Sequence, residues 1–289
     1  MEHIEQCLIC GHTELVTAFE GFDRYLDVRE SFRILRCRFC GNGFTSPRPD
    51  RHEIGRYYRD YGLHDLSFSP VYPGYHFRKF LPKPPAKLLD IGCGAGRLLA
   101  GLKEMGYSVE GLDISREAAD NARKAFGIHV HVGMIDELDL PEERYDAVTM
   151  SNYLEHVHDP LSTLKAVNRV MKYGGIAIAG SPNFRCITRR LLAEYWPALH
   201  LPCHLIHFNP RGYTEVFKNS GFEVIGRWDS INSRPLAAAL HKMAYERFGF
   251  RLPSVRFLKR ILMPAMFIAG RVHRSTLMGI AARKKAVSK

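Results

Sequence analysis

The stretch that decides the fold of this 289-residue chain is Lys87-Leu-Leu-Asp-Ile-Gly-Cys-Gly-Ala-Gly-Arg-Leu-Leu99. An apolar, strand-like run ends at Asp90 and turns into a helical pattern through three glycines at a spacing of two: Gly92, Gly94 and Gly96. Glycine permits a sharp turn and a close approach of the backbone to a ligand. A second strand-like run ends at Asp113, about 20 residues further on, where nucleotide-binding folds place a carboxylate for ribose hydroxyls. The pattern therefore predicts a nucleotide-binding α/β unit.

Two short motifs carry a resemblance to a known family. Asp90-Ile-Gly-Cys-Gly-Ala-Gly96, followed by Gly111-Leu-Asp-Ile-Ser115, resembles motif I and the next acidic motif of class I S-adenosylmethionine-dependent methyltransferases. A dinucleotide-binding turn reads G-x-G-x-x-G instead. The resemblance implies that the turn wraps the amino-acid and ribose parts of S-adenosylmethionine. The donor-binding positions that it implies are Asp90, Gly92, Gly94, Gly96, Asp113, Ile114, Met134, Ile135 and Ser151.

The adenine end of this implied site departs from the family pattern. The family usually has an aspartate directly after the glycine that follows the third strand, and Met134 stands there in this chain. Met134 and Ile135 are then the apolar walls for adenine, with Asp136 or its neighbouring backbone groups near the exocyclic amine. The polar contact to adenine stays open.

Strand-like and helical runs alternate regularly from residue 87 onward, which is typical of a parallel sheet covered on both faces. We expect an α/β fold, with a Rossmann-like, seven-stranded, mostly parallel sheet. The later strands are predicted at 145–150, 176–179 and 222–228, with a turn at Gly174-Gly175, and a final strand at 276–282. The predicted divisions are a zinc ribbon (1–50), an aromatic-rich helical bridge (51–85), a methyltransferase core (86–230), and a basic helical insertion with the final strand (231–289).

The first 50 residues contain two C-x-x-C-G knuckles. Two thiolates of one knuckle can face one ion, and two knuckles complete a tetrahedral Cys₄ zinc site. The predicted ligands are Cys7, Cys10, Cys37 and Cys40. Four cysteines leave no open coordination position, so a structural zinc is expected rather than a catalytic one. A redox dithiol is the alternative, although neither pair opens a helix in a βαβ context.

The charge of the chain is concentrated near its C-terminus. Residues 241–289 hold twelve of the 41 Lys and Arg residues and a single acid, which accounts for the whole net charge of +11. Within this block, residues 253–274 form a basic amphipathic pattern with Phe257, Leu258, Ile261 and Leu262 near one face. Three readings stay open: a lid packed on the core, contact with a membrane surface, or contact with nucleic acid.

The catalytic group is the least determined part of the prediction. Methyl transfer from a sulfonium needs alignment and, for some acceptors, a base. The candidates are His156, just past the fourth strand, and His204 or His207 in a His-Leu-Ile-His run, with Tyr153 positioning the acceptor. Structural roles remain the alternative for each histidine. The fourth strand does not lead into the Asn/Asp-Pro-Pro-aromatic motif of enzymes that methylate base amines, which favours an oxygen or carbon acceptor.

We therefore predict a cytoplasmic, S-adenosylmethionine-dependent methyltransferase with a structural zinc and a small-molecule acceptor. The acceptor classes considered are a sugar or sugar nucleotide, a quinone- or polyketide-like compound, and a lipid-linked intermediate. An RNA methyltransferase and a non-catalytic donor-binding module are the alternatives. Seven cysteines in a chain with no signal peptide pattern favour reduced thiols over disulfides.

Overall fold

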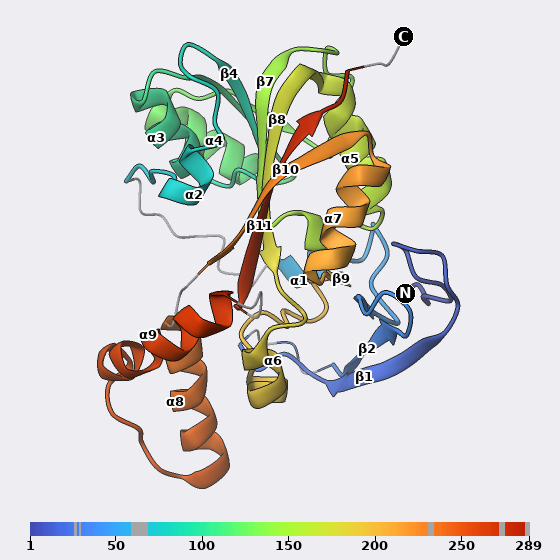
Figure 1. The fold of residues 1–289 in the computed structure, drawn as a ribbon, viewed down its shortest axis with the longest axis vertical. Helices are drawn as coiled ribbons and strands as arrows, with labels where there is room; N and C mark the ends of the chain where they lie inside the picture. Colours follow the sequence, from blue (N-terminus) through green and yellow to red (C-terminus); the bar gives the residue numbers. More distant parts are fainter. Residues whose placement is uncertain (26–27, 29, 59–68, 231–233, 272–274, 287–289) are drawn as a thin grey trace. The chain divides into compact units, whose positions relative to one another are not determined.

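The computed structural model describes the whole chain except residues 26–27, 29, 59–68, 231–233, 272–274 and 287–289 (Figure 1). The chain forms two compact units, each assembled from separated segments. The ribbon unit consists of Met1–Tyr61, Ser181–Tyr213 and Asp229–Met278. The sheet unit consists of Gly62–Gly180, Thr214–Trp228 and Gly279–Lys289. The predicted core over 86–230 is thus interrupted, because residues 181–213 belong to the ribbon unit.

The sheet unit is built around a seven-stranded sheet in the order β10-β11-β8-β7-β4-β5-β6. Parallel pairing joins β6 to β5, β5 to β4, β4 to β7 and β7 to β8. The strands are β4 (Lys87–Ile91), β5 (Ser108–Asp113), β6 (Val130–Val132), β7 (Tyr145–Ser151), β8 (Met171–Pro182), β10 (Phe222–Ser230) and β11 (Leu277–Lys284). In Figure 1, α3 and α4 lie on one side of this sheet and α5 lies on the other. The predicted Rossmann-like sheet with helices on both faces is confirmed.

Two helices of this unit, α4 and α5, begin at residues that helix-capping chemistry favours. The helical elements of the unit are α2 (Tyr75–Arg78), α3 (Arg97–Glu104), α4 (Arg116–Phe126), the 3-10 helix η1 (Leu154–His156), α5 (Pro160–Val170) and most of α7 (Pro210–Asn219). The hydroxyl of Ser115 accepts the N–H of Ala118 at the start of α4, and Gly127 ends that helix with a φ of 60°. Asp159 caps α5 in the same way, and Pro160 takes the first helical position, where its missing N–H costs nothing.

One predicted turn is wrong. Gly174 and Gly175 do not form a turn before the fifth strand but lie within β8, although Gly174 has a φ of 75°. Tyr145 pairs with Met171 and Ala147 pairs with Ile176, so β8 advances further than β7 between these two pairs. The extra residues of β8 are accommodated as an irregularity of the strand, and glycine supplies the left-handed conformation there.

A half-buried charge cluster ties four strands of the sheet unit together around Glu110 in β5. One carboxylate oxygen accepts bonds from Lys87 at 2.7 Å and Arg144 at 2.6 Å, and the other accepts from Tyr145 at 2.6 Å. His131 of β6 lies 3.2 Å from the second oxygen. Burial opposes the charge of Glu110, but the bonds from these four side chains outweigh it and hold the pKa of Glu110 well below its usual range.

Glu110→Gln is expected to lower the free energy of unfolding by about 3 kcal/mol, because it leaves Lys87 and Arg144 without their carboxylate partner. Since the folded pKa is depressed, this stabilisation is complete above the ordinary pKa of 4.5 and is lost as the pH falls through the folded pKa. Urea unfolding at pH 7 and pH 3 measures both effects. The exposed Glu142→Gln is the control, and an equal stability of the two variants at pH 7 contradicts the prediction.

The ribbon unit has its own four-stranded antiparallel sheet in the order β1-β2-β3-β9. Its strands are β1 (Leu15–Gly21), β2 (Phe32–Cys37), β3 (Gly43–Thr45) and β9 (Ile206–His207). Its helical elements are α1 (Gly55–Tyr58), α6 (Ile187–Leu192), the 3-10 helix η2 (Ala193–Tyr195), α8 (Arg234–Phe248) and α9 (Val255–Arg271). One hydrophobic core joins residues of β2, α1, α6 and α8, with Trp196 as its largest member. Segments far apart in the sequence therefore fold as one body.

In the aromatic-rich bridge, Tyr57 and Tyr72 bond to neighbouring segments, whereas Tyr75 is 70% exposed. Tyr57 is buried in the core of the ribbon unit, and its hydroxyl donates to Glu30 at 2.5 Å. In the sheet unit, the hydroxyl of Tyr72 bonds to Glu104 of α3. Tyr61, a further tyrosine of the bridge, lies outside the described residues.

The predicted insertion between the last two strands forms α8 and α9, which pack on each other. The predicted apolar face of α9 is divided: Leu262 packs against the core of the ribbon unit, whereas Phe257 and Ile261 are 52% and 58% exposed. Pro264 lies inside α9. The side chains of Met266, Ala269 and Arg271, and all of Arg274, lie outside the described residues.

Candidate functional site

The glycine turn after β4 is bound to the end of β5 by backbone hydrogen bonds. The N–H groups of Gly92 and Cys93 both donate to the carbonyl of Leu112, at 2.8 and 3.2 Å. Gly92, Gly94 and Gly96 all have a positive φ, between 52° and 75°. This conformation is strained for other residues, so the spacing of the glycines follows directly from the path of the turn.

Asp113, the last residue of β5, is held in a fixed orientation by this turn. Its Oδ2 accepts the N–H of Gly94 at 2.8 Å, and its Oδ1 accepts the N–H of Ser115 at 2.9 Å. A carboxylate has about four acceptor positions, so each oxygen keeps capacity for another donor. Asp113 is half-buried, and the α-carbon of Gly94 faces open space on the side where a side chain would stand. The turn thus offers a fixed carboxylate beside an open backbone surface.

Asp90 lies beneath the turn as a buried acid. The hydroxyl of Thr149 in β7 donates to its Oδ1 at 2.5 Å. Burial raises the pKa of Asp90 to about 7; the bond from Thr149 opposes this rise, and the negative charge of Asp113 adds to it. Asp90 therefore stabilises the connection between β4 and β7 under the site. The Thr149 contact was not predicted from the sequence.

Two further glycine contacts show how tightly the turn is packed. A β-carbon on Gly111 would lie 2.6 Å from the Sγ of Cys93. A β-carbon on Gly92 would lie 2.9 Å from the ring of Tyr153, which places the predicted acceptor-positioning tyrosine directly against the turn. The role of Gly111 was missed in the sequence, although its place two residues before Asp113 in a buried strand could have suggested it.

The remaining predicted donor-binding residues differ in exposure. Ile114 is 65% exposed and Met134 is half-buried, so both can offer an apolar surface to a ligand. Ile135 is fully buried, and Ser151 is exposed at the end of β7. Gly133 is joined to Asp113 through its N–H, which donates to the carbonyl of Asp113 at 3.0 Å. The segment with Met134 therefore begins next to the fixed carboxylate.

These features fit the chemistry of S-adenosylmethionine. Its ribose has two hydroxyl donors, which match the free acceptor positions of Asp113. Its amino-acid part needs backbone close by, and Gly94 has no side chain to prevent that approach. Ile114 and Met134 supply the apolar contacts that a flat adenine ring requires.

The predicted catalytic side chains belong to different units. Tyr153 and His156 lie in the sheet unit, on and beside η1, whereas His204 and His207 lie in the ribbon unit. Within the ribbon unit, His207 is buried and its Nε2 is 3.2 Å from the hydroxyl of Thr45. That hydroxyl donates its only proton to the carbonyl of His204 at 2.7 Å, so Nε2 of His207 must be the donor. Burial, with the charges of Arg189 and His200, lowers the pKa of His207 to about 3. His207 is a neutral structural residue.

His204 has a different geometry from His207. Its Nδ1 lies 3.0 Å from the carbonyl of Ala198, and a carbonyl can only accept. The proton of neutral His204 is therefore on Nδ1, and Nε2 keeps its lone pair. This is the tautomer that a general base requires.

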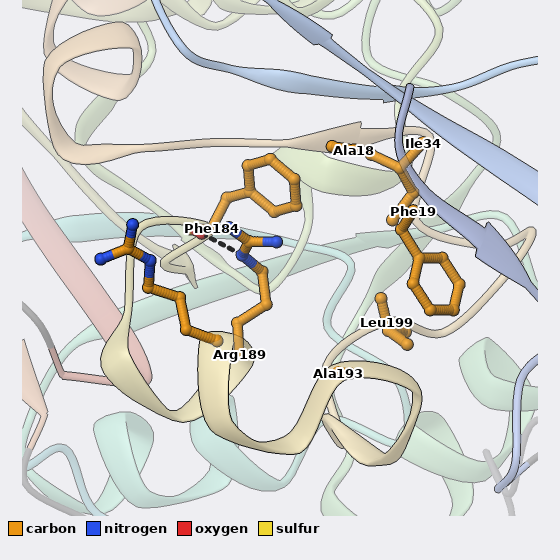
Figure 2. A pocket seen from close by; sticks show the side chains of 8 residues that line it. Ala18, Phe19, Ile34, Phe184, Arg189, Ala193 and Leu199 are labelled. Atoms are coloured by element: carbon orange, nitrogen blue, oxygen red, sulfur yellow. Dashed lines mark hydrogen bonds between the residues drawn. The ribbon is translucent and has the colours of Figure 1, made fainter. Parts of the chain in front are cut away.

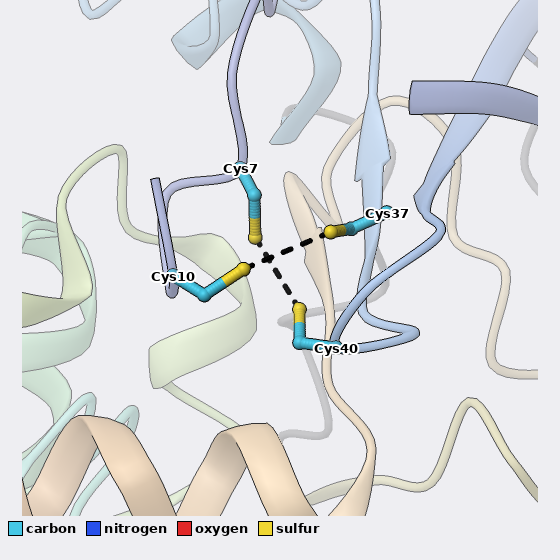
Figure 3. Close-up of side chains that lie close together, drawn as sticks. All are labelled: Cys7, Cys10, Cys37 and Cys40. Carbon is cyan, nitrogen blue, oxygen red and sulfur yellow. Dashed lines mark hydrogen bonds between the residues drawn. The ribbon is translucent and has the colours of Figure 1, made fainter. Parts of the chain in front are cut away.

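The four predicted zinc ligands converge in the ribbon unit (Figure 3). The sulfurs of Cys7 and Cys40 are 3.4 Å apart, those of Cys10 and Cys37 are 3.7 Å apart, and all four lie within 4.8 Å of one another. A tetrahedral ion with Zn–S bonds of about 2.3 Å places its sulfurs about 3.8 Å apart. The donor set and its spacing thus fit a Cys₄ zinc site.

The surroundings of the sulfurs also suit a metal site. Gly11 and Gly41 each follow a knuckle with a φ of 74°, and their N–H groups donate to the carbonyls of Cys7 and Cys37. The buried amide of Asn42 donates to the Sγ of Cys40 at 3.1 Å. Its oxygen accepts the N–H of Asn209, which connects the second knuckle to the chain after β9. Such outer hydrogen bonds orient ligands in metal sites.

Comparison with known proteins agrees with this picture. Residues 73–226, more than half of the chain, match a family model described as a methyltransferase domain. The ubiquinone biosynthesis O-methyltransferase of Alkalilimnicola ehrlichii is 41% identical over 103 residues, which cover 34% of this chain and 42% of that protein. The protein of the same name from Pseudomonas aeruginosa is 38% identical over 148 residues, which cover 49% of this chain and 61% of that protein. The chain thus spans about half the length of these curated relatives.

Solved structures show the same fold at low sequence identity. A methyltransferase dependent on S-adenosylmethionine from Thermotoga maritima matches with a TM-score of 0.52 and 20% identity over 80% of this chain and 96% of that one. The [4+2]-cyclase SpnF matches with a TM-score of 0.57 and 18% identity over 83% of this chain and 98% of that one. Likeness at this level concerns the fold alone. The family match extends over residues that include the glycine turn and Asp113, and the chain belongs to the methyltransferase-domain family.

Proposed function

We propose that this protein transfers the methyl group of S-adenosylmethionine to a hydroxyl oxygen of a quinone-like small molecule. The observation that carries the donor assignment is the pair of bonds from Gly94 and Ser115 that fix Asp113 beside an open glycine backbone. The acceptor assignment is supported by the relatives named ubiquinone biosynthesis O-methyltransferase. The donor-binding residues are those predicted from the sequence, and the four cysteines hold a structural zinc.

When bound, S-adenosylmethionine supplies an electrophilic methyl group on a sulfonium. The chain contributes binding and orientation: Asp113 accepts the ribose hydroxyls, and the turn from Gly92 to Gly96 approaches the amino-acid part. His204 receives the hydroxyl proton of the acceptor on Nε2, since Ala198 holds the other ring proton in place. His156 is the alternative base, and Tyr153 orients the acceptor.

The test is methyl transfer from radiolabelled donor to a catechol that carries a short isoprenyl chain. We expect His204→Gln to lower kcat by about 100-fold, the usual contribution of a general base, with little change in KM for the donor. The loss of the acidic limb of the kcat–pH profile distinguishes a base from a structural residue. If His156→Gln instead lowers kcat and removes the acidic limb, while His204→Gln keeps the wild-type kcat–pH profile, His156 is the general base. Donor binding without transfer to this catechol contradicts the proposed reaction, and transfer to RNA supports the RNA alternative instead.

We further propose that α9 rests on an anionic membrane surface. Among the described side chains of α9, the apolar residues Phe257, Ile261 and Ile268 are more than half exposed. The neighbouring basic side chains are Arg256, Lys259 and Arg260, and the sequence of α9 contains no acid. An amphipathic helix with this composition is suited to the boundary between lipid headgroups and acyl chains. None of the described helices has the length and hydropathy to cross a bilayer.

Liposome flotation tests this surface. The full-length protein is expected to float with vesicles that contain 30 mol% phosphatidylserine, at roughly tenfold higher recovery than with neutral vesicles. The double variant Phe257→Ser, Ile261→Ser removes apolar contact and is expected to lose this recovery. Leu191→Ser, which changes an apolar residue of α6 that is 67% exposed, is the control. Unchanged flotation of the double variant, or flotation independent of lipid charge, refutes the proposal.

A further inference from the structure

A cavity of about 200 Å³ lies in the ribbon unit, and its lining includes none of the four clustered cysteines. Figure 2 shows two unlike walls: Arg189 and Phe184 on one side, and Phe19, Ile34 and Leu199 on the other. The second wall consists of apolar side chains, and Ile34 and Leu199 in it are almost fully buried, as is Phe184 in the first wall. An engineered apolar cavity of about 150 Å³ is large enough to bind benzene. The cavity therefore has room for one ring and a small substituent.

Arg189 presents its guanidinium group to this cavity in a fixed position. Its Nε donates to the carbonyl of Phe184 at 2.6 Å, and its central carbon lies 4.2 Å from the centre of the Phe184 ring (Figure 2). In the part of the chain that the structure describes, neither terminal nitrogen of Arg189 has a hydrogen bond or an ion pair. A planar fork of two such nitrogens matches a carboxylate.

The charge around Arg189 is positive and uncompensated. Arg190 lines the same cavity, and Arg36 lies on the same face of β2 as Ile34. Neither of them forms an ion pair with a carboxylate among the described residues. Glu194, the nearest acid along α6 and η2, already pairs with Arg24 at 2.8 Å. Three arginines without an acid form an electrostatic site for an anion.

The pKa of Arg189 reflects the same excess of positive charge. Burial lowers this pKa, the Cys186 sulfur opposes the effect, and the charges of Arg190 and Arg36 lower the pKa further. Among the described residues, no carboxylate is one of the groups that shift this pKa. An anionic partner stabilises such a half-buried guanidinium more than it stabilises an exposed one, because the half-buried group has already lost part of its hydration.

We propose that this cavity binds a small aromatic carboxylate. The carboxylate meets the two terminal nitrogens of Arg189, and the ring lies between Phe184 and the apolar wall of Phe19, Ile34 and Leu199. The site uses none of the residues assigned to the methyl donor, so it goes beyond the proposed methyl transfer. It gives the ribbon unit a ligand of its own.

Isothermal titration of the full-length protein with benzoate, in the absence of S-adenosylmethionine, tests this site. Arg189→Gln is expected to weaken benzoate binding by about 10- to 100-fold, the usual loss for a charge-assisted pair. Arg33→Gln is the matched control: it removes the same charge from β2, on the face opposite Ile34. Arg189→Lys, which keeps the charge but not the fork, is expected to bind with intermediate affinity.

Two ligand controls separate the parts of the proposal. Benzyl alcohol, which lacks the charge, is expected to bind at least about tenfold more weakly than benzoate. Inorganic phosphate, which lacks the ring, is also expected to bind at least about tenfold more weakly than benzoate. Equal binding of either ligand overturns the proposal, as does equal benzoate affinity in Arg189→Gln and Arg33→Gln or the absence of benzoate binding up to 10 mM. Because no methyl donor is present, these results are independent of the proposed reaction.

Discussion

Asp113→Ala is expected to weaken the binding of S-adenosylmethionine by about 100-fold or more. The substitution removes two charge-assisted bonds to the ribose hydroxyls, each worth about 1.5–3 kcal/mol. In the wild-type protein the Asp113 carboxylate also accepts the N–H groups of Gly94 and Ser115 and thereby holds the turn and the start of α4 in place. The substitution removes these two bonds as well. Calorimetric titration with the donor measures the effect directly.

The control for this experiment is Asp120, which lies in α4, seven residues after Asp113. Asp120 carries the same charge, and among the described residues its carboxylate pairs with Arg123 at 3.1 Å. Asp120→Ala is expected to bind the donor with normal affinity. Asp113→Asn keeps one acceptor oxygen, and its affinity for the donor is expected to lie between those of Asp113→Ala and Asp120→Ala. Wild-type affinity in Asp113→Ala, in a protein with a normal circular dichroism spectrum, overturns the assignment of the donor site.

The second large effect concerns the metal. We expect the purified protein to contain one zinc per chain, and Cys10→Ser or Cys37→Ser to lose it. Structural zinc sites in small peptides contribute about 10–16 kcal/mol of binding free energy at pH 7, which is also folding free energy. Loss of zinc is therefore expected to unfold the sheet of the ribbon unit, in which β2 ends at Cys37.

Elemental analysis and thermal unfolding together test this expectation. Cys203→Ala is the matched control, because Cys203 is a buried thiol of the same unit that lies outside the cluster. It is expected to keep one zinc per chain and to lower the stability only by the loss of packing. A metal-free wild type with an intact ribbon unit contradicts the structural role, and a disulfide between two of the four cysteines contradicts the metal site itself.

The site illustrates what local sequence can predict. The positive φ values of Gly92, Gly94 and Gly96 and the end of β5 at Asp113 agree with the expected turn and strand. Each depends on residues close together in the chain, where the conformational preference of one residue type decides the outcome. The cysteine cluster was predictable for a similar reason, since two knuckles with identical spacing have one common use.

Contacts between distant segments were not predictable in the same way. The bond from Thr149 to Asp90, and the position of Tyr153 against Gly92, depend on the parallel pairing of β4 with β7. The turn expected at Gly174-Gly175 failed because β7 and β8 pair with an irregular register, which glycine residues tolerate. Glycine by itself does not distinguish a turn from an irregular strand.

The amino-acid sequence by itself determined the α/β class, the glycine turn with its carboxylate, and the two cysteine knuckles. These features follow from periodicity, backbone freedom and ligand spacing, which are local properties of the chain. Only the tertiary structure decided that residues 181–213 belong with the ribbon unit, and that Arg189 lies at the wall of a cavity with no acidic partner among the described residues. Both depend on which hydrophobic surfaces meet, because Phe184 and Leu199 are buried with Ile34 of β2, about 150 residues earlier in the chain.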